Sequence, residues 1–323
     1  MAVDVLAPGL ASSLQDLGRP GHYDVGIPPS GALDLFSAAA ANLLVGNDPS
    51  AAVLEAPYLG PRLRFAEPGL VAVTGASMPV LLNREPVPAW EALAVVEGDV
   101  LSFSHLQAGA RAYVAVAGGF DVPLVLGSRS TYGLGAFGGL QGRTLQAGDV
   151  LPVGPSTGGR PGARVPEELR PSYGREVEVR VVLGLYDHRL SDAGRSTLLD
   201  TAWELTPVAD RIGFRYKGAT LQWKEREQPF GAGSDPSNIV DAGYPIGSIQ
   251  VPGGVEPIVL HRDAVSGGGY AMVGTVISAD LDLVGQSAPG TRTRFRPVTL
   301  EQALEARQVR SQRLAALREA VGR

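Results

Sequence analysis

The chain has 323 residues, of which 44% are hydrophobic and 19% charged, and its formal net charge is −5. This length corresponds to about two average domains, and the hydrophobic fraction excludes a disordered linker. The absence of cysteine excludes disulfides, thiolate metal sites and a cysteine nucleophile. The acidic balance argues against a broad surface that binds nucleic acid.

Glycine and proline are over-represented. The chain contains 42 glycines and 25 prolines, about a fifth of its residues, against about 12% in average usage. Such a composition leaves little room for long helices and favours many short strands joined by turns. We therefore predict a mainly β protein with two domains.

Alternating apolar and polar residues predict two series of strands. The first series is predicted at residues 2–6, 62–65, 70–74, 80–83, 93–103 with a break at 97–99, 111–117 and 143–153. The second is predicted at residues 177–183, 211–216, 220–223, 248–251, 257–261, 273–278 and 291–298. A segment rich in Gly, Pro and Arg separates the two series. The predicted divisions are an N-terminal domain at 1–160, a linker at 161–175, a C-terminal domain at 176–298 and a helix at 299–323.

Few helices are predicted. Residues 33–45 are rich in alanine and stop at Gly46, residues 187–199 form a weaker candidate, and residues 299–321 form the longest. Thr299 and Gln302 have the spacing of a capping box. The last helix carries an apolar stripe of Leu300, Leu304, Leu314, Leu317 and Val321. Its arginines favour a solvated outer face over a nucleic-acid contact, because the whole chain is acidic.

Several kinds of site and location are not predicted. The first ten residues lack the basic and apolar regions of a signal peptide, and no apolar run reaches 18 residues, so we expect a cytoplasmic protein without a membrane segment. No two of the four histidines lie within one helical turn, so no zinc motif is predicted. Neither Lys217 nor Lys224 belongs to a GxxxxGK phosphate loop.

The densest polar block runs from residue 15 to residue 34, just before the first predicted helix. Free N–H groups at a helix start favour an anion or a carbonyl oxygen. Gln15 and Ser30 lie in this block, Arg19 could grip a carboxylate, and Asp16 and Asp34 could act as bases or hydrogen-bond acceptors. The alternative is structural: Ser30 or Asp34 caps the helix, and Asp16 and Arg19 form a local salt bridge.

Two further segments of the first half could contribute to a site. Glu55 stands in an apolar run, so it is either an exposed edge residue or a site carboxylate. Residues 133–142 contain a GxGxxG pattern but lead into a turn and a strand, which favours a loop that covers a site over a dinucleotide fold. Arg129 lies just upstream, among hydroxyl residues that could bind a small polar ligand.

In the second half, residues 243–252 mirror the first polar block. Gln250 offers an amide that can meet another amide with one donor and one acceptor. Gly268, in a run of three glycines before Tyr270, would let the backbone approach a ligand closely. A plain hairpin loop explains the same pattern. A hydrolytic triad of Asp16, His22 and Ser30 is disfavoured, because all three lie in one short loop region without a GxSxG elbow.

An ordered set of motifs resembles the biotin-dependent carboxyltransferase family that includes the C subunit of 5-oxoprolinase, KipA, allophanate hydrolase subunit 2 and a module of urea carboxylase. The resemblance covers residues 3 to 297. It rests on QDLGRPG at residues 15–21, GIPPSGALD at 26–34, LE at 54–55, VTGA at 73–76, RAYVAVAGG at 111–119, GSRST at 127–131, LQGRTLQAGD at 140–149, GSIQVP at 247–252 and TVISADL at 275–281.

This resemblance implies two cyclophilin-like β-barrel domains and, as partner, the KipI-like B subunit. The family acts on the planar N–C=O group of urea, biotin or the 5-oxoproline lactam. Asp16, Asp34 and Glu55 are then the catalytic candidates. The candidates for substrate binding are Gln15, Arg19, Ser30, Arg129, Gln250, Gly268 and Tyr270.

The leading expectation is a subunit of an ATP-dependent 5-oxoprolinase that acts with the KipI-like partner and a large subunit and opens 5-oxoproline to glutamate. One alternative is carboxyl transfer between a urea-like substrate and biotin on a separate carrier, and another is a non-catalytic regulatory module of the KipA type. Residues 265–271, VSGGGYA, depart from the usual TTGGYP pattern of the family, which puts the substrate in doubt. The missing phosphate loop suggests that ATP binds at a subunit junction, in a partner or by an unfamiliar mode.

Overall fold

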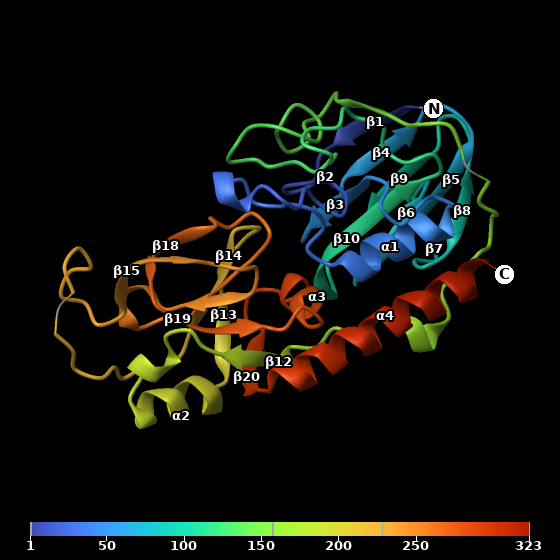
Figure 1. Cartoon of the computed structure of the whole chain (residues 1–323). Helices are drawn as coiled ribbons and strands as arrows, with labels where there is room; N and C mark the ends of the chain where they lie inside the picture. Colours follow the sequence, from blue (N-terminus) through green and yellow to red (C-terminus); the bar gives the residue numbers. More distant parts are fainter. Residues whose placement is uncertain (1, 157, 228, 323) are drawn as a thin grey trace. The chain divides into compact units, whose positions relative to one another are not determined.

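The computed structural model describes residues 2–156, 158–227 and 229–322, and Figure 1 shows that the chain is mainly β. It divides into two compact units. The first unit contains Met1–Arg19, Ser30–Tyr173 and Ser311–Arg323, and the second contains Pro20–Pro29 and Gly174–Arg310. The polar block before the first helix therefore has its middle in one unit and its two ends in the other.

The first unit is built from two antiparallel sheets that enclose one apolar core. The first sheet has the order β11 (Val150–Pro152), β1 (Ala2–Ala7), β4 (Arg62–Phe65), β9 (Val100–Phe103), β6 (Val80–Leu82), β7 (Glu85–Val87). The second has the order β2 (Ser13–Gln15), β3 (Val53–Pro57), β10 (Ala108–Val116), β5 (Gly69–Ser77), β8 (Ala92–Val95). Alternate residues of both sheets fill the core between them, as in sandwiches and barrels.

Helix α1 (Leu35–Leu44) covers the other face of the second sheet, together with buried apolar residues from later in the chain. Its alanines let it pack closely on β5, β10 and β3. Because that sheet is covered on both faces, β5 and β10 are buried almost throughout. The polar side chains of Thr74, Arg111 and Tyr113 on these strands therefore lie in the interior.

The second unit is a closed seven-stranded barrel. Its strands follow the order β12 (Glu176–Leu183), β19 (Met272–Val276), β16 (Ser248–Gln250), β17 (Ile258–Leu260), β14 (Gly213–Lys217), β13 (Trp203–Ala209), β20 (Arg292–Pro297). A separate two-stranded sheet pairs β15 (Asn238–Gly243) with β18 (Gly267–Tyr270). The short helices are α2 (Asp192–Asp200) and α3 (Leu281–Gly285), with 3-10 turns η1 (Tyr23–Val25), η3 (Asp187–Arg189) and η4 (Pro252–Gly254). The mainly β fold class is confirmed.

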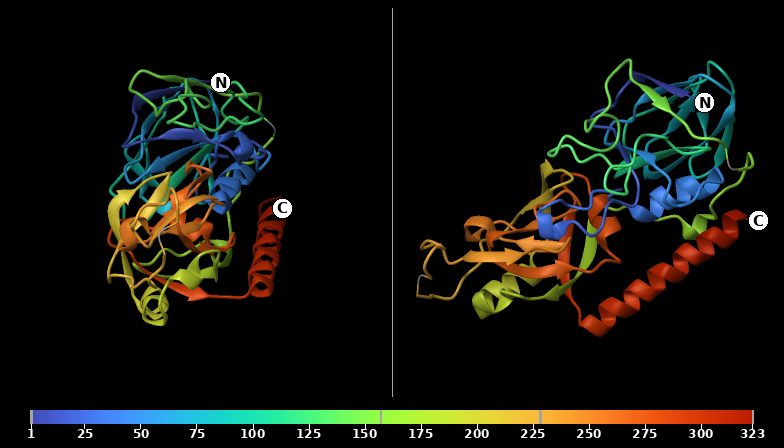
Figure 2. Two further views of the ribbon diagram at one scale, coloured as in Figure 1. Left: turned by 60° about the vertical axis from the view of Figure 1, so that its left-hand side comes forward. Right: turned by 45° about the horizontal axis from the view of Figure 1, so that its top comes forward.

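The chain ends in the long helix α4 (Leu300–Gly322), which Figure 2 shows as one continuous rod. The predicted capping box is present: Thr299 N donates to Gln302 Oε1 at 3.0 Å, and Gln302 N donates to Thr299 Oγ1 at 3.2 Å. The predicted stripe holds only in part. Leu317 and Val321 are buried in the first unit beside α1, whereas Leu300 and Leu304 are 60% and 42% exposed.

The segment predicted as a linker, residues 161–175, is not a free connection at its start. Ala163 and Val165 are buried in the core beside α1. Val165 N donates to Trp90 O at 3.0 Å, and Ala92 N donates to Ala163 O at 2.8 Å. The segment thus extends the pairing of β8, and 3-10 turn η2 (Glu167–Leu169) follows it. Composition missed this because two buried apolar residues among glycines and prolines suffice to dock an extended segment.

Two predicted strands are much shorter in the structure. Of residues 143–153, only β11 (Val150–Pro152) is a strand, because Arg143 and Asp149 close the preceding residues into a turn. Residues 220–223 form only an isolated bridge between Trp223 and Leu190. Among the helices of the described residues, none has the length and apolar character that a membrane crossing needs.

Candidate functional site

Asp16 directly follows β2, and its carboxylate accepts hydrogen bonds from the loop at residues 128–130. Its Oδ1 accepts from Gly18 N at 2.7 Å, Ser128 Oγ at 2.6 Å and Ser130 Oγ at 2.5 Å. Its Oδ2 accepts from Arg129 N at 2.6 Å. Both oxygens of the carboxylate thus accept hydrogen bonds, from four donors in all. Asp16 therefore organises the loop, and the predicted salt bridge to Arg19 is replaced by these contacts.

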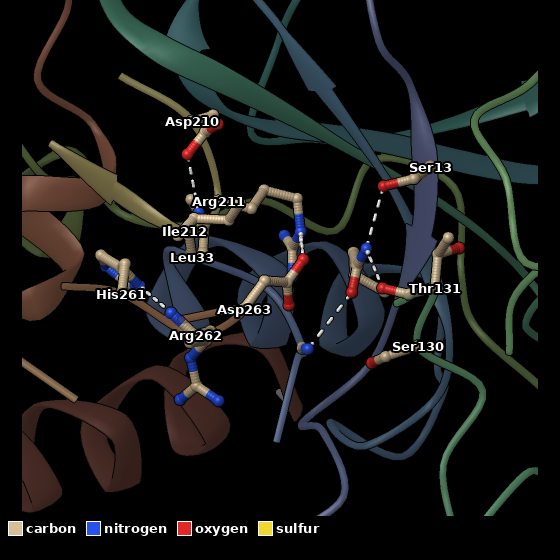
Figure 3. A network of polar contacts seen from close by, with 12 residues as sticks. Ser13, Leu33, Ser130, Thr131, Asp210, Arg211, Ile212, His261, Arg262 and Asp263 are labelled. Atoms are coloured by element: carbon tan, nitrogen blue, oxygen red, sulfur yellow. Dashed lines mark hydrogen bonds and ion pairs between the residues drawn. The ribbon is translucent and has the colours of Figure 1, made fainter. Parts of the chain in front are cut away.

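Gln15 performs a similar task one residue earlier. Its Nε2 donates to Ser13 Oγ at 2.9 Å and to the Thr131 carbonyl at 3.3 Å, and its Oε1 accepts from Gly31 N at 3.2 Å (Figure 3). Ser30 is fully buried with φ 53°, and Gly31 has φ 93°. A Cβ on Gly31 would lie 2.8 Å from Gly18 N, so only glycine fits there. These residues bring the two ends of the polar block together.

Arg19 is 1% exposed, although arginine is almost never buried without partners. Its guanidinium donates to the carbonyls of Ser130 and Val125 and lies 5.0 Å from the Phe137 ring centroid. A Cβ on Gly138 would approach Ser130 O to 2.0 Å and Arg19 Nη2 to 2.7 Å. Glycine at 138 thus makes room for Arg19. This part of the predicted covering loop serves internal packing.

Glu55 lies on β3, inside the sheet, and is 2% exposed. Its Oε2 accepts from Leu33 N and from Tyr113 Oη, both at 2.8 Å. Arg111 Nε lies 3.9 Å from Glu55 Oε1, and both side chains are 2% exposed. The possibility of an exposed edge residue is therefore excluded. Glu55 is instead the acceptor of a buried cluster that includes Arg111 and Tyr113.

Asp34 is the N-cap of α1, as the structural alternative proposed. Its Oδ1 accepts from Ser37 N at 2.9 Å, and its Oδ2 accepts from Ser37 Oγ at 2.6 Å and Tyr173 Oη at 3.2 Å. Its own N–H donates to Tyr113 Oη at 2.8 Å. The Tyr113 hydroxyl thus joins the helix start to Glu55. Burial, followed by the charges of Glu55 and Asp34, raises the pKa of Tyr113 well above 10.0, so Tyr113 is a neutral donor.

Arg129 has a divided role. Its backbone N–H binds Asp16, but its side chain points to the surface. The guanidinium donates to the Val122 carbonyl at 2.9 Å and to Asp121 Oδ1 at 2.8 Å. Contact between this guanidinium and a substrate stays a prediction.

In the second unit, Gln250 ends β16 and is 6% exposed. Gly268 and Tyr270 lie on β18, and the Tyr270 side chain is 42% exposed. Tyr244 connects them, because its hydroxyl contacts Gly268 O at 2.6 Å, Tyr270 O at 2.8 Å and Tyr270 N at 2.7 Å. Gly268 and Tyr270 therefore belong to one hydrogen-bonded group centred on Tyr244, whereas Gln250 lies on a strand of the barrel.

A second polar cluster of this unit surrounds β17 and β14. Arg211 Nε donates to Asp263 Oδ2 at 2.8 Å, and Asp263 is 5% exposed (Figure 3). His261 is fully buried, with Nδ1 accepting from Arg262 N at 3.0 Å and Nε2 3.3 Å from Leu281 O. With Nδ1 accepting from the Arg262 N–H, Nε2 is the ring nitrogen placed to donate to the Leu281 carbonyl. Both groups stabilise turns of the barrel.

The residues that sequence reasoning did not single out for a site are Arg111, Tyr113 and Tyr244. Arg111 and Tyr113 occupy alternate positions of the otherwise apolar strand AGARAYVAV, a pattern that indicates buried polar side chains on one face of β10. In the structure, Tyr113 pairs with Glu55 on the adjacent strand β3. Tyr244 had no such signal. Its contacts to β18 depend on residues more than 20 positions away.

Within residues 2–156, 158–227 and 229–322, no group of three His, Asp or Glu side chains could hold a metal ion. Lys217 pairs with Glu204 at 3.0 Å, and Lys224 Nζ donates to the His188 carbonyl at 2.8 Å. Both lysines are therefore engaged at the surface, and the residues present do not form a phosphate cradle of the Walker type.

The profile of the carboxyltransferase domain family, subdomains A and B, matches residues 25–297, and the chain belongs to this family. The C subunit of 5-oxoprolinase from Escherichia coli is 34% identical over 304 residues, which cover 94% of this chain and 94% of that protein. Urea amidolyase of Lachancea kluyveri is 32% identical over 320 residues, which cover 95% of this chain but 17% of that protein.

Among solved structures, urea carboxylase of Kluyveromyces lactis matches with a TM-score of 0.92 and 32% identity. The match covers 98% of this chain and 29% of that chain. The chain therefore spans less than a third of this enzyme and of urea amidolyase, whereas it spans nearly all of the 5-oxoprolinase C subunit. The relatives are parts of hydrolases or carboxylases, which supports a role in an enzyme complex.

Proposed function

We propose that this chain is a subunit of an ATP-dependent 5-oxoprolinase that opens the lactam of 5-oxoproline to glutamate, together with the KipI-like B subunit and a large subunit. One observation carries the proposal. The alignment with the C subunit of 5-oxoprolinase leaves only a small part of either sequence uncovered. With urea amidolyase, by contrast, 83% of the relative has no counterpart in this chain.

The second unit offers groups that suit a lactam. A lactam presents one N–H donor and one carbonyl acceptor in a plane. The Gln250 amide can complement both, since it has a donor and an acceptor of its own. The Tyr270 ring, on β18 of the same unit, is a partly exposed flat surface on which a small planar ring can pack.

The first unit supplies a fixed framework in this proposal. Asp16, Asp34 and Glu55 accept hydrogen bonds from named donors of the same unit. We assign their contribution to positioning the loops at residues 15–34 and 127–131. Proton transfer by these carboxylates stays a prediction. ATP is assigned to the complex, because the residues of this chain do not form a Walker-type cradle.

The direct test is reconstitution. The chain, its KipI-like partner and the large subunit are mixed with 5-oxoproline and ATP, and glutamate and phosphate are measured. We expect both products in equal amounts, and only when all three proteins are present. If no 5-oxoproline-dependent product forms from correctly folded components, the proposed function is wrong.

A second candidate is carboxyl transfer to a urea-like acceptor from biotin on a separate carrier protein. The structural match to urea carboxylase supports it. The chain contains two lysines and no biotinyl-lysine motif, so a carrier would be needed. Incubating the chain with carboxylated carrier and urea should then consume carboxybiotin, and no consumption with urea-like acceptors would exclude this function.

The regulatory alternative of the KipA type is tested by substitution. Asp34→Ala and Glu55→Ala are poor choices, because both residues hold the fold together. Tyr270→Ala is better suited, since the side chain is exposed. A purely regulatory chain would keep its partner binding and its regulation of the partner's target in this variant. A chain that takes part in the enzyme reaction would keep partner binding but lose turnover.

A further inference from the structure

Tyr244 directly follows β15, which Figure 1 shows with β18 in the second unit, and its side chain packs in a buried cluster with Leu260 of β17 and Met272 of β19. Its side chain is 3% exposed, and its N–H donates to Ser266 O at 2.8 Å. Its hydroxyl lies 2.6 Å from Gly268 O and 2.8 Å from Tyr270 O, and accepts from Tyr270 N at 2.7 Å. One hydroxyl thus contacts both ends of the segment 268–270.

The hydroxyl has one proton and two acceptor positions. The proton is shared between the carbonyl oxygens of Gly268 and Tyr270, and one acceptor position serves the Tyr270 N–H. Burial, the largest cause, raises the pKa of Tyr244 above 10.0. The group therefore remains a neutral donor throughout the physiological range.

The strand that Tyr244 holds is weak without it. β15 and β18 share three registered pairs, interrupted by a bulge between Asn238 and Ala242. β18 begins with three consecutive glycines, which lose more backbone entropy on ordering than other residues. Two-stranded sheets are marginally stable on their own. An additional anchor is therefore needed to keep β18 in one conformation.

The ring of Tyr244 also fits this strand closely. A Cβ on Gly268 would lie 3.2 Å from Tyr244 Cε2 and 3.7 Å from its Oη. The first distance is shorter than an ordinary van der Waals contact, so the strand or the ring would have to move by a few tenths of an ångström. Glycine at 268 thus permits the hydroxyl to reach the backbone.

We propose that Tyr244 is a positioning residue: its hydroxyl fixes Gly268 and Tyr270 on β18 and so sets the geometry of the surface that receives the planar amide. This proposal rests on the proposed function, because it assumes that Gln250 and β18 face the substrate. Tyr244 acts through these groups and does not touch the substrate itself. The expected signature is a weaker substrate interaction with an unchanged chemical step.

The main variant is Tyr244→Phe, which keeps the ring and removes the hydroxyl. The matched control is Tyr216→Phe, because Tyr216 is a fully buried tyrosine of the same barrel. Its ring packs edge-on against the ring of Phe295. A second variant, Gly268→Ala, retains the hydroxyl but displaces the strand. Melting temperatures confirm that each variant folds.

Hydrogen exchange of the Tyr270 amide in the isolated chain is measured first. Tyr244→Phe should accelerate this exchange at least about tenfold, since a bond worth about 1 kcal/mol and its cooperative neighbours are lost. Tyr216→Phe should leave it unchanged. Equal exchange in wild type and Tyr244→Phe would overturn the proposal.

Steady-state kinetics of the reconstituted complex come second. For Tyr244→Phe we expect KM for 5-oxoproline to rise about tenfold with kcat within a factor of about two, and Gly268→Ala should shift KM in the same direction by less. An equal rise in KM for Tyr216→Phe would indicate a general structural effect and contradict the proposal. If wild type forms no glutamate, the proposed function fails. The exchange result then still decides whether Tyr244 anchors β18.

Discussion

In the first unit, the polar residues predicted for the site are nearly all buried, and their bonding capacity is used within the protein. Glu55 is 2% exposed and Asp34 is 1% exposed. In the second unit, Tyr270 is 42% exposed on a two-stranded sheet outside the barrel. The same motif-based reasoning thus identified a rigid framework in one unit and an accessible surface in the other. Residue type and spacing do not distinguish these two uses.

The contrast also concerns glycine. In the first unit, Gly31 and Gly138 allow backbone and Arg19 to pack closely. In the second unit, Gly268 leaves room for the Tyr244 ring, and β18 remains at the surface. The high glycine content therefore serves interior packing as much as access to a ligand. Four experiments can test this contrast between a buried framework and an accessible surface.

Replacing Glu55 with alanine should have the largest effect on stability. It removes the acceptor for Leu33 N and Tyr113 Oη and leaves Arg111 buried beside an apolar residue. Removing one partner of a buried ion pair costs about 3–5 kcal/mol. Urea denaturation followed by tryptophan fluorescence measures the loss. Asp121→Ala, which breaks the exposed pair with Arg129, is the control and should cost less than about 1 kcal/mol. Similar losses in both variants would contradict a buried framework.

Replacing Tyr270 with alanine should affect activity and leave stability nearly unchanged. If the proposed function is correct, kcat/KM for 5-oxoproline falls about tenfold, which corresponds to about 1.4 kcal/mol. The unfolding free energy should change by less than about 0.5 kcal/mol, because the side chain lies at the surface of the two-stranded sheet. Val240→Ala on the paired strand β15 is the matched control, since Val240 is 64% exposed. Unchanged kinetics for Tyr270→Ala would show that this surface does not receive the substrate.

Replacing Asp34 with alanine should lower stability by about 1–2 kcal/mol through loss of the helix cap. Asp34→Ser should restore part of this, because serine also accepts a hydrogen bond at an N-cap. Ser191→Ala provides a comparison in the second unit, where Ser191 Oγ accepts from Gly194 N at 3.0 Å. Thermal unfolding of the three variants measures the difference. A stability unchanged by Asp34→Ala would refute the structural role of this carboxylate.

The weakest effect is expected for the acid dependence of the turn before β11. A hydrogen bond from Arg143 is the main cause that lowers the pKa of Asp149 below 3.8 in the folded state. A lowered folded-state pKa stabilises the protein above the unfolded value of 3.8, and this contribution disappears as the pH falls through the folded value. The melting-temperature difference between wild type and Asp149→Asn should therefore shrink below about pH 3.8. If the melting-temperature difference between the two proteins does not depend on pH, the ion pair between Arg143 and Asp149 is not its source.

The sequence predicted several features for sound local reasons. The capping box of α4 depends only on Thr299 and Gln302, three residues apart. The break in the predicted strand 93–103 is also correct, since β8 ends at Val95 and β9 begins at Val100. The stop of α1 was predicted from Gly46, which has φ 79°. In each case the decisive residues are neighbours in the chain.

Features that depend on residues distant in the sequence were harder to predict from the sequence. Ala163 and Val165 dock beside β8 although their surroundings look like a linker. Glu55 has Arg111 and Tyr113 as partners because strands β3 and β10 are adjacent in the sheet. Tyr113, which donates to Glu55, is 58 positions away in the sequence. The hydroxyl of Tyr244 meets β18 across more than 20 residues.

The amino-acid sequence alone was sufficient for the β-rich class, the capped C-terminal helix, the absence of cysteine chemistry and, through its ordered motifs, the resemblance to the carboxyltransferase family that the comparisons confirmed. Only the three-dimensional arrangement showed which polar residues form their hydrogen bonds within the protein. Asp16, Asp34 and Glu55 hold donors from segments distant in sequence, whereas Tyr270 remains exposed. The physical reason is that burial and hydrogen-bond partners depend on how the chain packs. An aspartate or glutamate in the sequence can therefore hold a loop in place or bind a substrate, and residue type alone does not distinguish the two roles.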